Sequence, residues 1–358
     1  MRVGISLLTL VPGISGGSET YARELVRALG RAGDSEHTYC VFLPTIAGDV
    51  EGLPVEVVTE YRATRSTPGR IVAMARGWFA GGRLERHFAD LGAVHFPLTV
   101  MVPRTRRLAV TTILDVQHEL LPQFFSRAER AYRRLVYARS VRESERVVTI
   151  SQHAATAIAD RLGVPEEKLR PIHLGIDHEV FRPAGERTNR QKDGPPGEFL
   201  LYPARGWPHK NHARLFAAFR ELRRRHPGLE LVLTSYDGPV PDGVRSLGHV
   251  SRAELVALYQ RAEALVFPSL YEGFGQPPLE AMACGCPVAS SDVTSLPEVV
   301  GRAARLFDPT SVEDLIEAVE DVLANPGAWR ARGLERAAAF SWDETARRHE
   351  AVYSELSS

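Results

Sequence analysis

Short apolar segments alternate with longer amphipathic segments along the whole chain. Apolar runs typical of buried strands occupy residues 3–8, 39–43, 93–96, 109–114 and 147–150, and in the second half residues 199–202, 229–234, 264–267 and 287–290. Amphipathic segments predict helices at residues 19–30, 213–225, 252–261, 278–283 and 312–324. Strands that alternate with helices predict parallel sheets with crossover helices, which is an α/β fold.

The length of 358 residues is too great for one compact core and fits two domains of roughly 150 to 180 residues each. Between residues 182 and 198 the composition changes to proline, glycine and charged residues, which is typical of a linker. We therefore predict a first doubly wound domain over residues 1–182, a linker over 183–197, a second such domain over 198–340, and a C-terminal helix over 341–358.

The composition excludes several classes of protein. Hydrophobic residues make up 44% and charged residues 25% of the chain, which excludes disorder, collagen and a disulfide scaffold. The 44 basic and 44 acidic residues cancel, so the net charge predicts no nucleic-acid partner. No apolar run approaches the roughly 18 to 20 residues that cross a bilayer, and three cysteines favour a reducing, cytoplasmic location.

Charge is unevenly distributed in the first domain. Residues 62–146 contain 16 arginines against seven acidic residues. An arginine-rich solvated surface explains this excess, and so does a surface for an anionic membrane or a phosphorylated acceptor. The helical segment 127–146, in which apolar residues lie between arginines, is where we expect such contact.

Gly16 and Gly17 follow the first predicted strand and open the first predicted helix. Paired glycines allow close approach of a ligand, and a helix N-terminus favours an anion. A tight strand-to-helix turn explains the same pair. The loop lacks the G-x-G-x-x-G dinucleotide fingerprint.

Arg205 and Lys210 follow the first strand of the second domain. In an open parallel sheet, ligands bind outside the carboxyl ends of the strands, so both cations are expected in the interdomain cleft. Two fixed cations there suit a diphosphate. Either cation alone is also typical of an ordinary solvated surface.

The most specific segment is residues 269–283, SLYEGFGQPPLEAMA. A predicted strand runs into a glycine-rich loop that carries Glu272, and Pro277 and Pro278 suit the first turn of a helix that carries Glu280. The loop and the two carboxylates could hold two polyhydroxyl groups at once. The helix dipole explains either glutamate alone, but not the glycines on both sides of Phe274.

Together these features resemble the family-4 retaining glycosyltransferases of GT-B fold. Further matches are Ser151-Gln152-His153, Gly175-Ile176-Asp177 and Phe340-Ser341-Trp342. The resemblance covers nearly the whole chain. It implies two Rossmann-like domains that face a cleft, the first for the acceptor and the second for a nucleotide sugar, with the C-terminal helix crossing back to the first domain.

The resemblance also implies site residues. The diphosphate would bind Arg205 and Lys210, the transferred sugar would bind Glu272, and the ribose would bind Glu280. The full implied donor site is Gly16, Gly17, Arg205, Lys210, Val250, Tyr271, Glu272, Gly273, Phe274, Gly275, Gln276 and Glu280. The implied catalytic residues are His118, Arg205, Lys210 and Glu272. His118 matches a first-domain histidine near the sugar and acceptor, although a lone histidine is usually structural.

The resemblance favours retaining, front-face hexosyl transfer without a metal or other cofactor. No Asp-x-Asp triplet is present to hold a divalent ion, and Arg205 and Lys210 can neutralise the leaving diphosphate. Similarity to the mannosyl-transferring branch predicts GDP-mannose as donor, with UDP-linked hexoses as the alternative.

The acceptor is left open as a glycan of polysaccharide biosynthesis, a glycolipid or a small glycoside. Three other functions also stay open: a 2-epimerase on the same fold, a glycoside hydrolase that uses Glu272 and Glu280, and a catalytically silent subunit.

Overall fold

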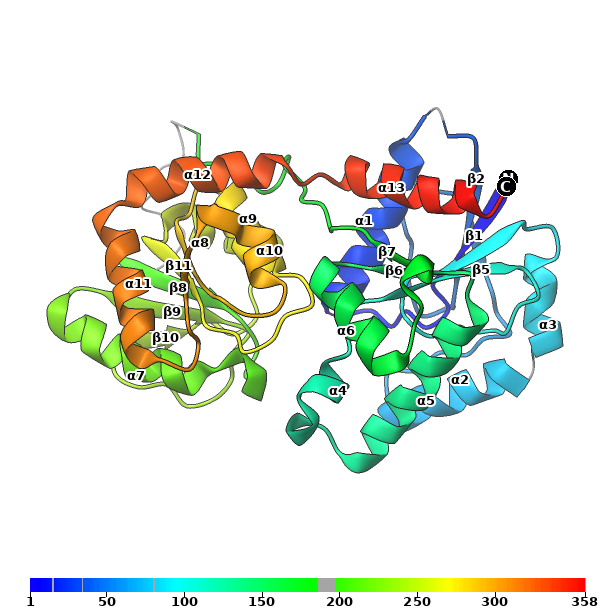
Figure 1. Cartoon of the computed structure of the whole chain (residues 1–358), viewed down its shortest axis with the longest axis horizontal. Helices are drawn as coiled ribbons and strands as arrows, with labels where there is room; N and C mark the ends of the chain where they lie inside the picture. The colour runs from blue at the N-terminus through cyan, green and yellow to red at the C-terminus, as the bar shows by residue number, and fades with distance from the viewer. Residues whose placement is uncertain (15, 34, 80, 186–196, 358) are drawn as a thin grey trace. The chain divides into compact units, whose positions relative to one another are not determined.

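The structure is a computed structural model that describes residues 1–14, 16–33, 35–79, 81–185 and 197–357. The chain forms two compact units (Figure 1): residues 1–175 together with 342–358, and residues 176–341. The first unit ends before the predicted boundary at residue 182, because Ile176 forms a parallel bridge with Ser341 and His178 Nε2 lies 2.9 Å from the Phe340 carbonyl oxygen. Most of the predicted linker, residues 186–196, lies outside the described residues.

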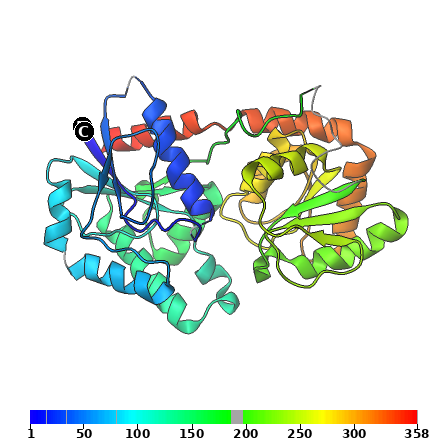
Figure 2. The same ribbon diagram turned by 180° about the vertical axis from the view of Figure 1, so that it is seen from behind.

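The first unit is built on a seven-stranded parallel sheet in the order β3-β2-β1-β4-β5-β6-β7. Its strands are β1 Arg2–Ser6, β2 Thr38–Leu43, β3 Val55–Val57, β4 Ala93–Phe96, β5 Leu108–Ile113, β6 Arg146–Thr149 and β7 Leu169–Pro171. Its helices are α1 Gly17–Arg31, α2 Thr67–Phe79, α3 Gly81–Glu85, α4 Gln117–Leu120, α5 Arg127–Glu143, α6 Gln152–Leu162 and α13 Trp342–Glu355. Helices α1 and α13 lie on one side of the sheet, and α2 and α5 lie on the other (Figures 1 and 2).

The second unit is built on a six-stranded parallel sheet in the order β10-β9-β8-β11-β12-β13. Its strands are β8 Phe199–Pro203, β9 Glu230–Thr234, β10 Val244–Ser246, β11 Ala264–Phe267, β12 Val288–Ser291 and β13 Arg305–Phe307. Its helices are α7 His212–Arg225, α8 Arg252–Arg261, α9 Gln276–Ala283, α10 Leu296–Val300, α11 Val312–Ala324 and α12 Pro326–Ala338. Two parallel sheets with helices on both faces confirm the predicted fold class of two Rossmann-like domains.

The helix starts follow from local sequence. At α8 the Ser251 hydroxyl accepts from the Glu254 N–H while the Glu254 carboxylate accepts from the Ser251 N–H, which is a capping box. The hydroxyls of Ser126, Ser151 and Ser311 cap α5, α6 and α11, each by accepting a hydrogen bond from a backbone N–H in the first turn. The central strands are apolar on both faces, as expected for sheets with helices on both sides.

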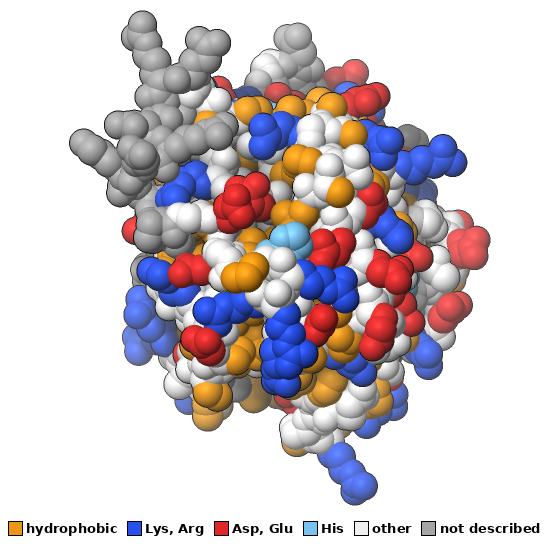
Figure 3. All heavy atoms as spheres, turned by 90° about the vertical axis from the view of Figure 1, so that its left-hand side faces the viewer, with side chains coloured by type: hydrophobic (Ala, Val, Ile, Leu, Met, Phe, Trp, Pro, Cys, Tyr) orange, Lys and Arg blue, Asp and Glu red, His pale blue; other side chains and the backbone are white. Residues whose placement is uncertain are grey.

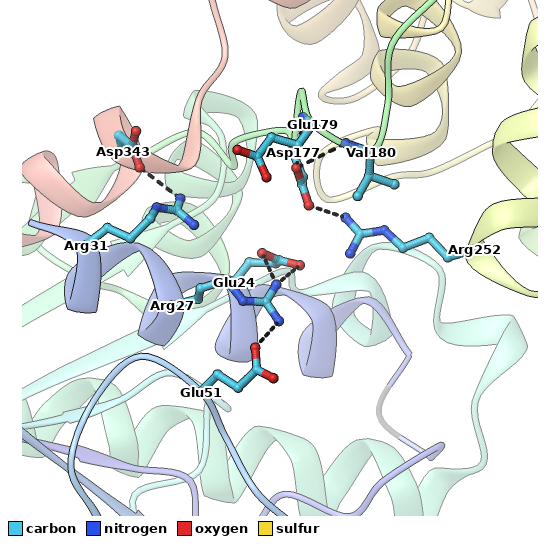
Figure 4. A network of polar contacts seen from close by, with 9 residues as sticks. All are labelled: Glu24, Arg27, Arg31, Glu51, Asp177, Glu179, Val180, Arg252 and Asp343. Carbon is cyan, nitrogen blue, oxygen red and sulfur yellow. Dashed lines mark hydrogen bonds and ion pairs between the residues drawn. The ribbon is translucent and has the colours of Figure 1, made fainter. Parts of the chain in front are cut away.

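Helix α13 packs on α1 in the first unit (Figure 2). Arg31 of α1 and Asp343 of α13 form an ion pair of 2.9 Å, drawn in Figure 4, and Arg170 pairs with Glu355 at 2.7 Å. Beneath these surface pairs, the hydroxyl of Tyr21 lies 3.0 Å from His349 Nε2. The last helix of the chain is therefore part of the first unit's core.

Each sheet has a topological switch point. In the first unit β1 lies between β2 and β4, and in the second unit β8 lies between β9 and β11. The loops after β1 and β4, and those after β8 and β11, therefore diverge to opposite sides of their sheet at its carboxyl edge. Open parallel sheets bind their ligands at such points.

The surface and the cysteines bear on the predicted partners and location. Figure 3 shows one face of the molecule on which basic and acidic side chains are interspersed. Cys40, Cys284 and Cys286 are all buried and unpaired with one another. Among the described helices, none combines the length and the apolar character that a bilayer span requires.

Candidate functional site

The loops after β8 and β11 meet at the switch point of the second unit. Lys210 Nζ lies 2.6 Å from Glu272 Oε1, and the Leu270 N–H donates to the His209 carbonyl oxygen over 2.8 Å. Both charged side chains are only 13% exposed. The structure thus brings together two residues that are 62 positions apart in sequence.

Asn211 fixes the position of Lys210. It adopts a left-handed backbone conformation with φ 61° and precedes α7. Its side-chain amide donates to the carbonyl oxygens of Pro268 and Pro309 over 3.0 and 2.9 Å. These bonds tie the loop after β8 to the segments that follow β11 and β13, so Lys210 is held by buried hydrogen bonds of its neighbour as well as by its charge.

The loop that follows β11 and carries Glu272 is hydrogen-bonded to the segment that follows β12. Ser295 Oγ lies 3.0 Å from the carbonyl oxygen of Glu272 and 2.7 Å from that of Phe274, and the Glu272 N–H donates to Thr294 Oγ1 over 3.1 Å. The ring of Phe274 is buried and packs edge-on against Phe340. The loop backbone is therefore fixed on both sides of Gly273.

Gly275 is required where this loop enters α9. Its φ is 120°, and a Cβ atom there would lie 2.8 Å from Leu296 Cδ2. A side chain at this position would be strained and would displace Leu296. Pro277 and Pro278 open the helix, as predicted, with Gln276 as its first residue.

Glu280 lies on α9 beneath the loop. Its Oε2 accepts a hydrogen bond from the hydroxyl of Tyr259 over 3.1 Å. Burial raises the pKa of the Glu280 carboxyl to about 7, although the Tyr259 hydrogen bond and the charge of Arg252 oppose this shift. Arg252 also forms an ion pair with Asp177, drawn in Figure 4.

The other predicted second-unit residues lie around this centre. Arg205 is exposed, with its guanidinium 5.5 Å from the centre of the Trp207 ring. Val250 is half-buried and directly precedes the N-cap of α8, and Tyr271 is buried beside Glu272. Neither Val250 nor Tyr271 offers a charged group.

Gly16 and Gly17 belong to the first unit. Gly16 has φ 52° and Gly17 begins α1. A Cβ atom built on either would meet no atom of the described chain within 4 Å. The described chain thus leaves space beside the start of this 15-residue helix, and the binding of an anion there stays a prediction.

His118 lies on α4 in the first unit and is fully buried. Its ring packs edge-on against Tyr137 at 4.9 Å, and burial lowers its pKa to about 4. Within the described residues neither ring nitrogen has a hydrogen-bond partner, although Nε2 lies 3.6 Å from Glu119 Oε1. Buried polar groups are nearly always paired, so two ring nitrogens without a hydrogen-bond partner are unusual. Both nitrogens could take part in a hydrogen bond to another group.

Sequence reasoning missed Asn211, Thr294, Ser295 and Tyr259. Thr294 and Ser295 lie in the loop after β12, at the carboxyl edge of the sheet, so their position was a usable signal. Asn211 is the sequence neighbour of Lys210, which the sequence did predict. Tyr259 has no such signal, since it lies inside α8 among residues of ordinary helical pattern.

Comparisons with known proteins show which family the two units belong to. A family model described as "Glycosyltransferase Family 4" matches residues 15–180, and one described as "Glycosyl transferases group 1" matches residues 186–340. O-antigen chain mannosyltransferase B of Escherichia coli is 32% identical over 266 residues, which cover 68% of this chain and 69% of that protein. The chain belongs to glycosyltransferase family 4.

Other family-4 relatives share the mannosyltransferase name. Serotype-specific mannosyltransferase WbdA of Escherichia coli is 35% identical over 59% of this chain, but the match covers only 29% of WbdA. MMP alpha-(1->4)-mannosyltransferase of Mycolicibacterium hassiacum is 30% identical over 74% of this chain and 65% of that protein.

Solved structures establish the family-4 fold. Sucrose-phosphate synthase from Thermosynechococcus elongatus superposes with a TM-score of 0.79 at 20% identity, covering 99% of both chains. WaaG, a glycosyltransferase involved in lipopolysaccharide biosynthesis, superposes with a TM-score of 0.71 at 16% identity, covering 98% of this chain and 99% of WaaG. The architecture is therefore GT-B, as the sequence resemblance implied.

Proposed function

We propose that the protein is a retaining mannosyltransferase that transfers mannose from GDP-mannose to a glycan, lipid-linked or small glycoside acceptor. The observation that carries this proposal is the Lys210–Glu272 ion pair of 2.6 Å at the switch point of the second unit, with the buried Glu280 on the adjoining helix. The mannosyltransferase names of the relatives support the choice of sugar.

The second unit offers three separate chemistries on two neighbouring strand-loop-helix segments, β8 to α7 and β11 to α9. Lys210, with Arg205 on the same loop, supplies positive charge for a diphosphate, which gains negative charge as the sugar leaves. Glu272 can accept hydrogen bonds from sugar hydroxyls, and Glu280 can accept them from the ribose. Because Lys210 and Glu272 are in contact, the bond between phosphate and sugar would lie next to both.

The proposed reaction proceeds by front-face attack. The bond between the anomeric carbon and the leaving phosphate oxygen breaks, the acceptor oxygen bonds to the same face of that carbon, and the phosphate takes the acceptor's proton. A glycosidase would need an acid and a nucleophile on either side of the sugar. Here Glu272 is engaged by Lys210 and Glu280 by Tyr259, which favours binding roles for both.

The proposal includes metal-independent turnover, because Lys210 and Arg205 can neutralise the leaving group. The test is release of nucleotide from GDP-mannose and from UDP-glucose, each in EDTA and in magnesium. We expect release from GDP-mannose at an equal rate in both buffers. Strict dependence on magnesium would contradict the metal-independent part, and conversion of GDP-mannose to an isomer without release would favour a 2-epimerase.

The proposal also includes a cytoplasmic location with peripheral contact to an anionic membrane. Three buried, unpaired cysteines support a reducing compartment. Leu135 of α5 is 64% exposed among the arginines of that helix, which supports surface contact with lipid. Vesicle cosedimentation that is indifferent to anionic lipid would remove the membrane contact.

Affinity for GDP is expected to depend on the ionisation of Glu280. The pKa of this carboxyl is about 7, and the ionised form accepts stronger hydrogen bonds from the ribose hydroxyls than the protonated form does. The ionised fraction, and with it the affinity, is expected to fall about tenfold as the pH is lowered from about 8 to about 6. Isothermal titration with GDP across this range measures the change.

Glu280→Gln is the matched control for this titration, because it keeps the size of the side chain and replaces the ionisable carboxyl with an amide that does not titrate. Its GDP affinity is expected to be low and independent of pH over the same range. If Glu280→Gln kept the wild-type pH dependence, another group would be responsible and the ribose role would be lost.

His118→Ala is expected to lower the rate of transfer about 100-fold while leaving GDP affinity unchanged. The fully buried ring has two nitrogens without a hydrogen-bond partner in the described chain, and it belongs to the unit that lacks the Lys210–Glu272 pair. Steady-state transfer and GDP titration measure the two effects separately. Unchanged transfer in a folded variant would assign the ring to packing against Tyr137.

A further inference from the structure

The first unit contains a cavity of about 730 Å³ that none of the roles above uses. Thr9 and Val11, which follow β1, line it, and so do Leu98 and Val100, which follow β4. The cavity therefore lies at the switch point of the first sheet, between the loops that diverge from its carboxyl edge. Ser18, in the first turn of α1 beside Gly17, also lines it.

Most of the lining is apolar. Helix α2 contributes Ile71 and Met74, and α5 contributes Tyr132, Val136 and Tyr137. The Tyr132 hydroxyl is directed to the Met74 sulfur over 3.3 Å, and burial raises the pKa of the Tyr137 hydroxyl to about 12. Aromatic rings and a thioether form walls that suit a hydrocarbon chain or ring.

The charged part of the lining consists of Arg70, Glu129 and Arg133. Arg133 Nε and Nη2 both donate to Glu129 Oε1, over 3.2 and 3.0 Å, and its guanidinium lies 5.0 Å from the centre of the Phe125 ring. The carboxylate of Glu129 is thus engaged, and the lining has an excess of one positive charge. This excess favours an anionic group at the cavity.

The same lining is poorly suited to a bare sugar. Sugar hydroxyls are bound by carboxylates and amides, which can pair with several hydroxyls at once. Among the described residues that line the cavity, Glu129 is the one carboxylate, and there is no asparagine or glutamine. The ligand that matches these walls is apolar over most of its length and carries an anionic group.

We propose that this cavity binds the acceptor, and that the acceptor combines a hydrocarbon portion with a phosphate group. This inference rests on the proposed function, because it names the substrate class of the first unit of a transferase. The apolar walls from α2 and α5 hold the hydrocarbon portion, and Arg70 and Arg133 hold the phosphate.

Decyl phosphate is the probe, with decyl glucoside as an uncharged amphiphile of the same chain length and inorganic phosphate as an anion without a chain. Isothermal titration below the micellar concentration is expected to show decyl phosphate binding at least about tenfold more tightly than either comparison compound. Equal binding of decyl glucoside would overturn the anionic part of the inference. Equal binding of inorganic phosphate would overturn the apolar part.

Ala128→Trp places a large side chain in the cavity from an exposed position of α5. Ala131→Trp, at an exposed position of the same helix outside the lining, is the matched control. We expect Ala128→Trp to weaken decyl phosphate binding at least about tenfold and Ala131→Trp to leave it unchanged. An equal effect of the two variants, or none from either, would place the amphiphile elsewhere on the protein.

Arg70→Gln tests the charge, with Arg76→Gln on the same helix as its control. Arg70→Gln is expected to weaken decyl phosphate binding about fivefold to tenfold while decyl glucoside binding stays the same. An equal loss for both amphiphiles would show a structural effect and would contradict the role of Arg70 in holding phosphate.

Titration with GDP separates this inference from the proposed function, because nucleotide binding is assigned to the second unit. GDP binding without decyl phosphate binding would overturn the acceptor class and leave the donor proposal intact. Decyl phosphate binding without any nucleotide binding would support the ligand class of the cavity and overturn the donor proposal. Cosedimentation with phosphatidic acid vesicles that Ala128→Trp abolishes would identify a membrane lipid as the source of the phosphate. If the wild-type protein does not cosediment with these vesicles, the phosphate belongs to a soluble acceptor.

Discussion

Replacing Lys210 with alanine is expected to lower the rate of nucleotide release from GDP-mannose about 100- to 1000-fold while weakening GDP binding less than about tenfold. Lys210 is held 2.6 Å from Glu272 by the hydrogen bonds of Asn211, so its charge is fixed before the reaction begins. A fixed cation stabilises the charge that develops on the leaving diphosphate more than the charge already present in bound GDP. Steady-state kinetics and GDP titration measure the two effects.

Arg223→Ala is the matched control, because it removes a cation of the same unit that pairs with Asp242 at the surface. We expect wild-type kinetics from it. Lys210→Ala also leaves Glu272, a largely buried carboxylate, without its partner, so unfolding of the variant must be followed beside its kinetics. A rate within threefold of the wild type in folded Lys210→Ala would contradict the proposed stabilisation of the leaving group.

The first unit is expected to lose stability in mild acid, because its core contains neutral histidines. His349 of α13 is fully buried, with Nε2 3.0 Å from the Tyr21 hydroxyl and Nδ1 2.7 Å from the Thr345 carbonyl oxygen. Burial lowers the pKa of His349 to about 4 and lowers that of neighbouring His95 well below its ordinary range. His95 in turn lies 2.8 Å from the Tyr353 hydroxyl.

The direction and range of this effect follow from linkage. Above the ordinary histidine pKa of about 6.5 the ring is neutral in both folded and unfolded chains, and the stability is complete. Between about 6.5 and the folded pKa of about 4, the unfolded chain binds a proton that the folded chain does not, so the free energy of unfolding falls. The total loss for His349 alone is about 3 kcal/mol. Glu344 and Glu355, whose pKa values hydrogen bonds from arginines lower to about 2, lose their contribution at lower pH.

Urea unfolding followed by circular dichroism between about pH 6 and about pH 5 measures this loss. His349→Gln is expected to reduce the slope of the unfolding free energy against pH by one proton, which is about 1.4 kcal/mol per pH unit. His249→Gln, at an exposed loop of the second unit, provides the comparison for a histidine outside the core. An unchanged slope in His349→Gln would show that its ring is not buried in the neutral form.

The central strands could be located from the sequence, but the edge strands could not. The predicted runs at residues 93–96 and 264–267 match β4 and β11 at both ends. The four strands without a prediction are β3, β7, β10 and β13, which have three residues each and form the edges of the two sheets. Each contains a charged residue, and its extended conformation depends on pairing with its neighbour rather than on its own sequence.

The candidate site was predictable where residues carry charge and follow a strand. Lys210 and Glu272 both met this condition, and the structure places them in contact. Ser295, whose hydroxyl donates to two main-chain carbonyl oxygens, could be found only from its place in the loop after a strand. Tyr259 lies inside a helix and donates to a carboxylate on another helix, so the sequence gives no sign of its role. The burial of His118 also depends on the packing of Tyr137 and Phe125, which lie beyond its own helix.

Isothermal titration of the purified protein with GDP, UDP and dTDP, first in EDTA and then with magnesium, tests the central claim most directly. The account predicts that GDP binds at least about tenfold more tightly than UDP or dTDP, with the same affinity in both buffers. Preferential binding of UDP would contradict GDP-mannose as the donor, and the absence of binding for all three nucleotides would contradict the assignment of the second unit as a nucleotide-sugar site.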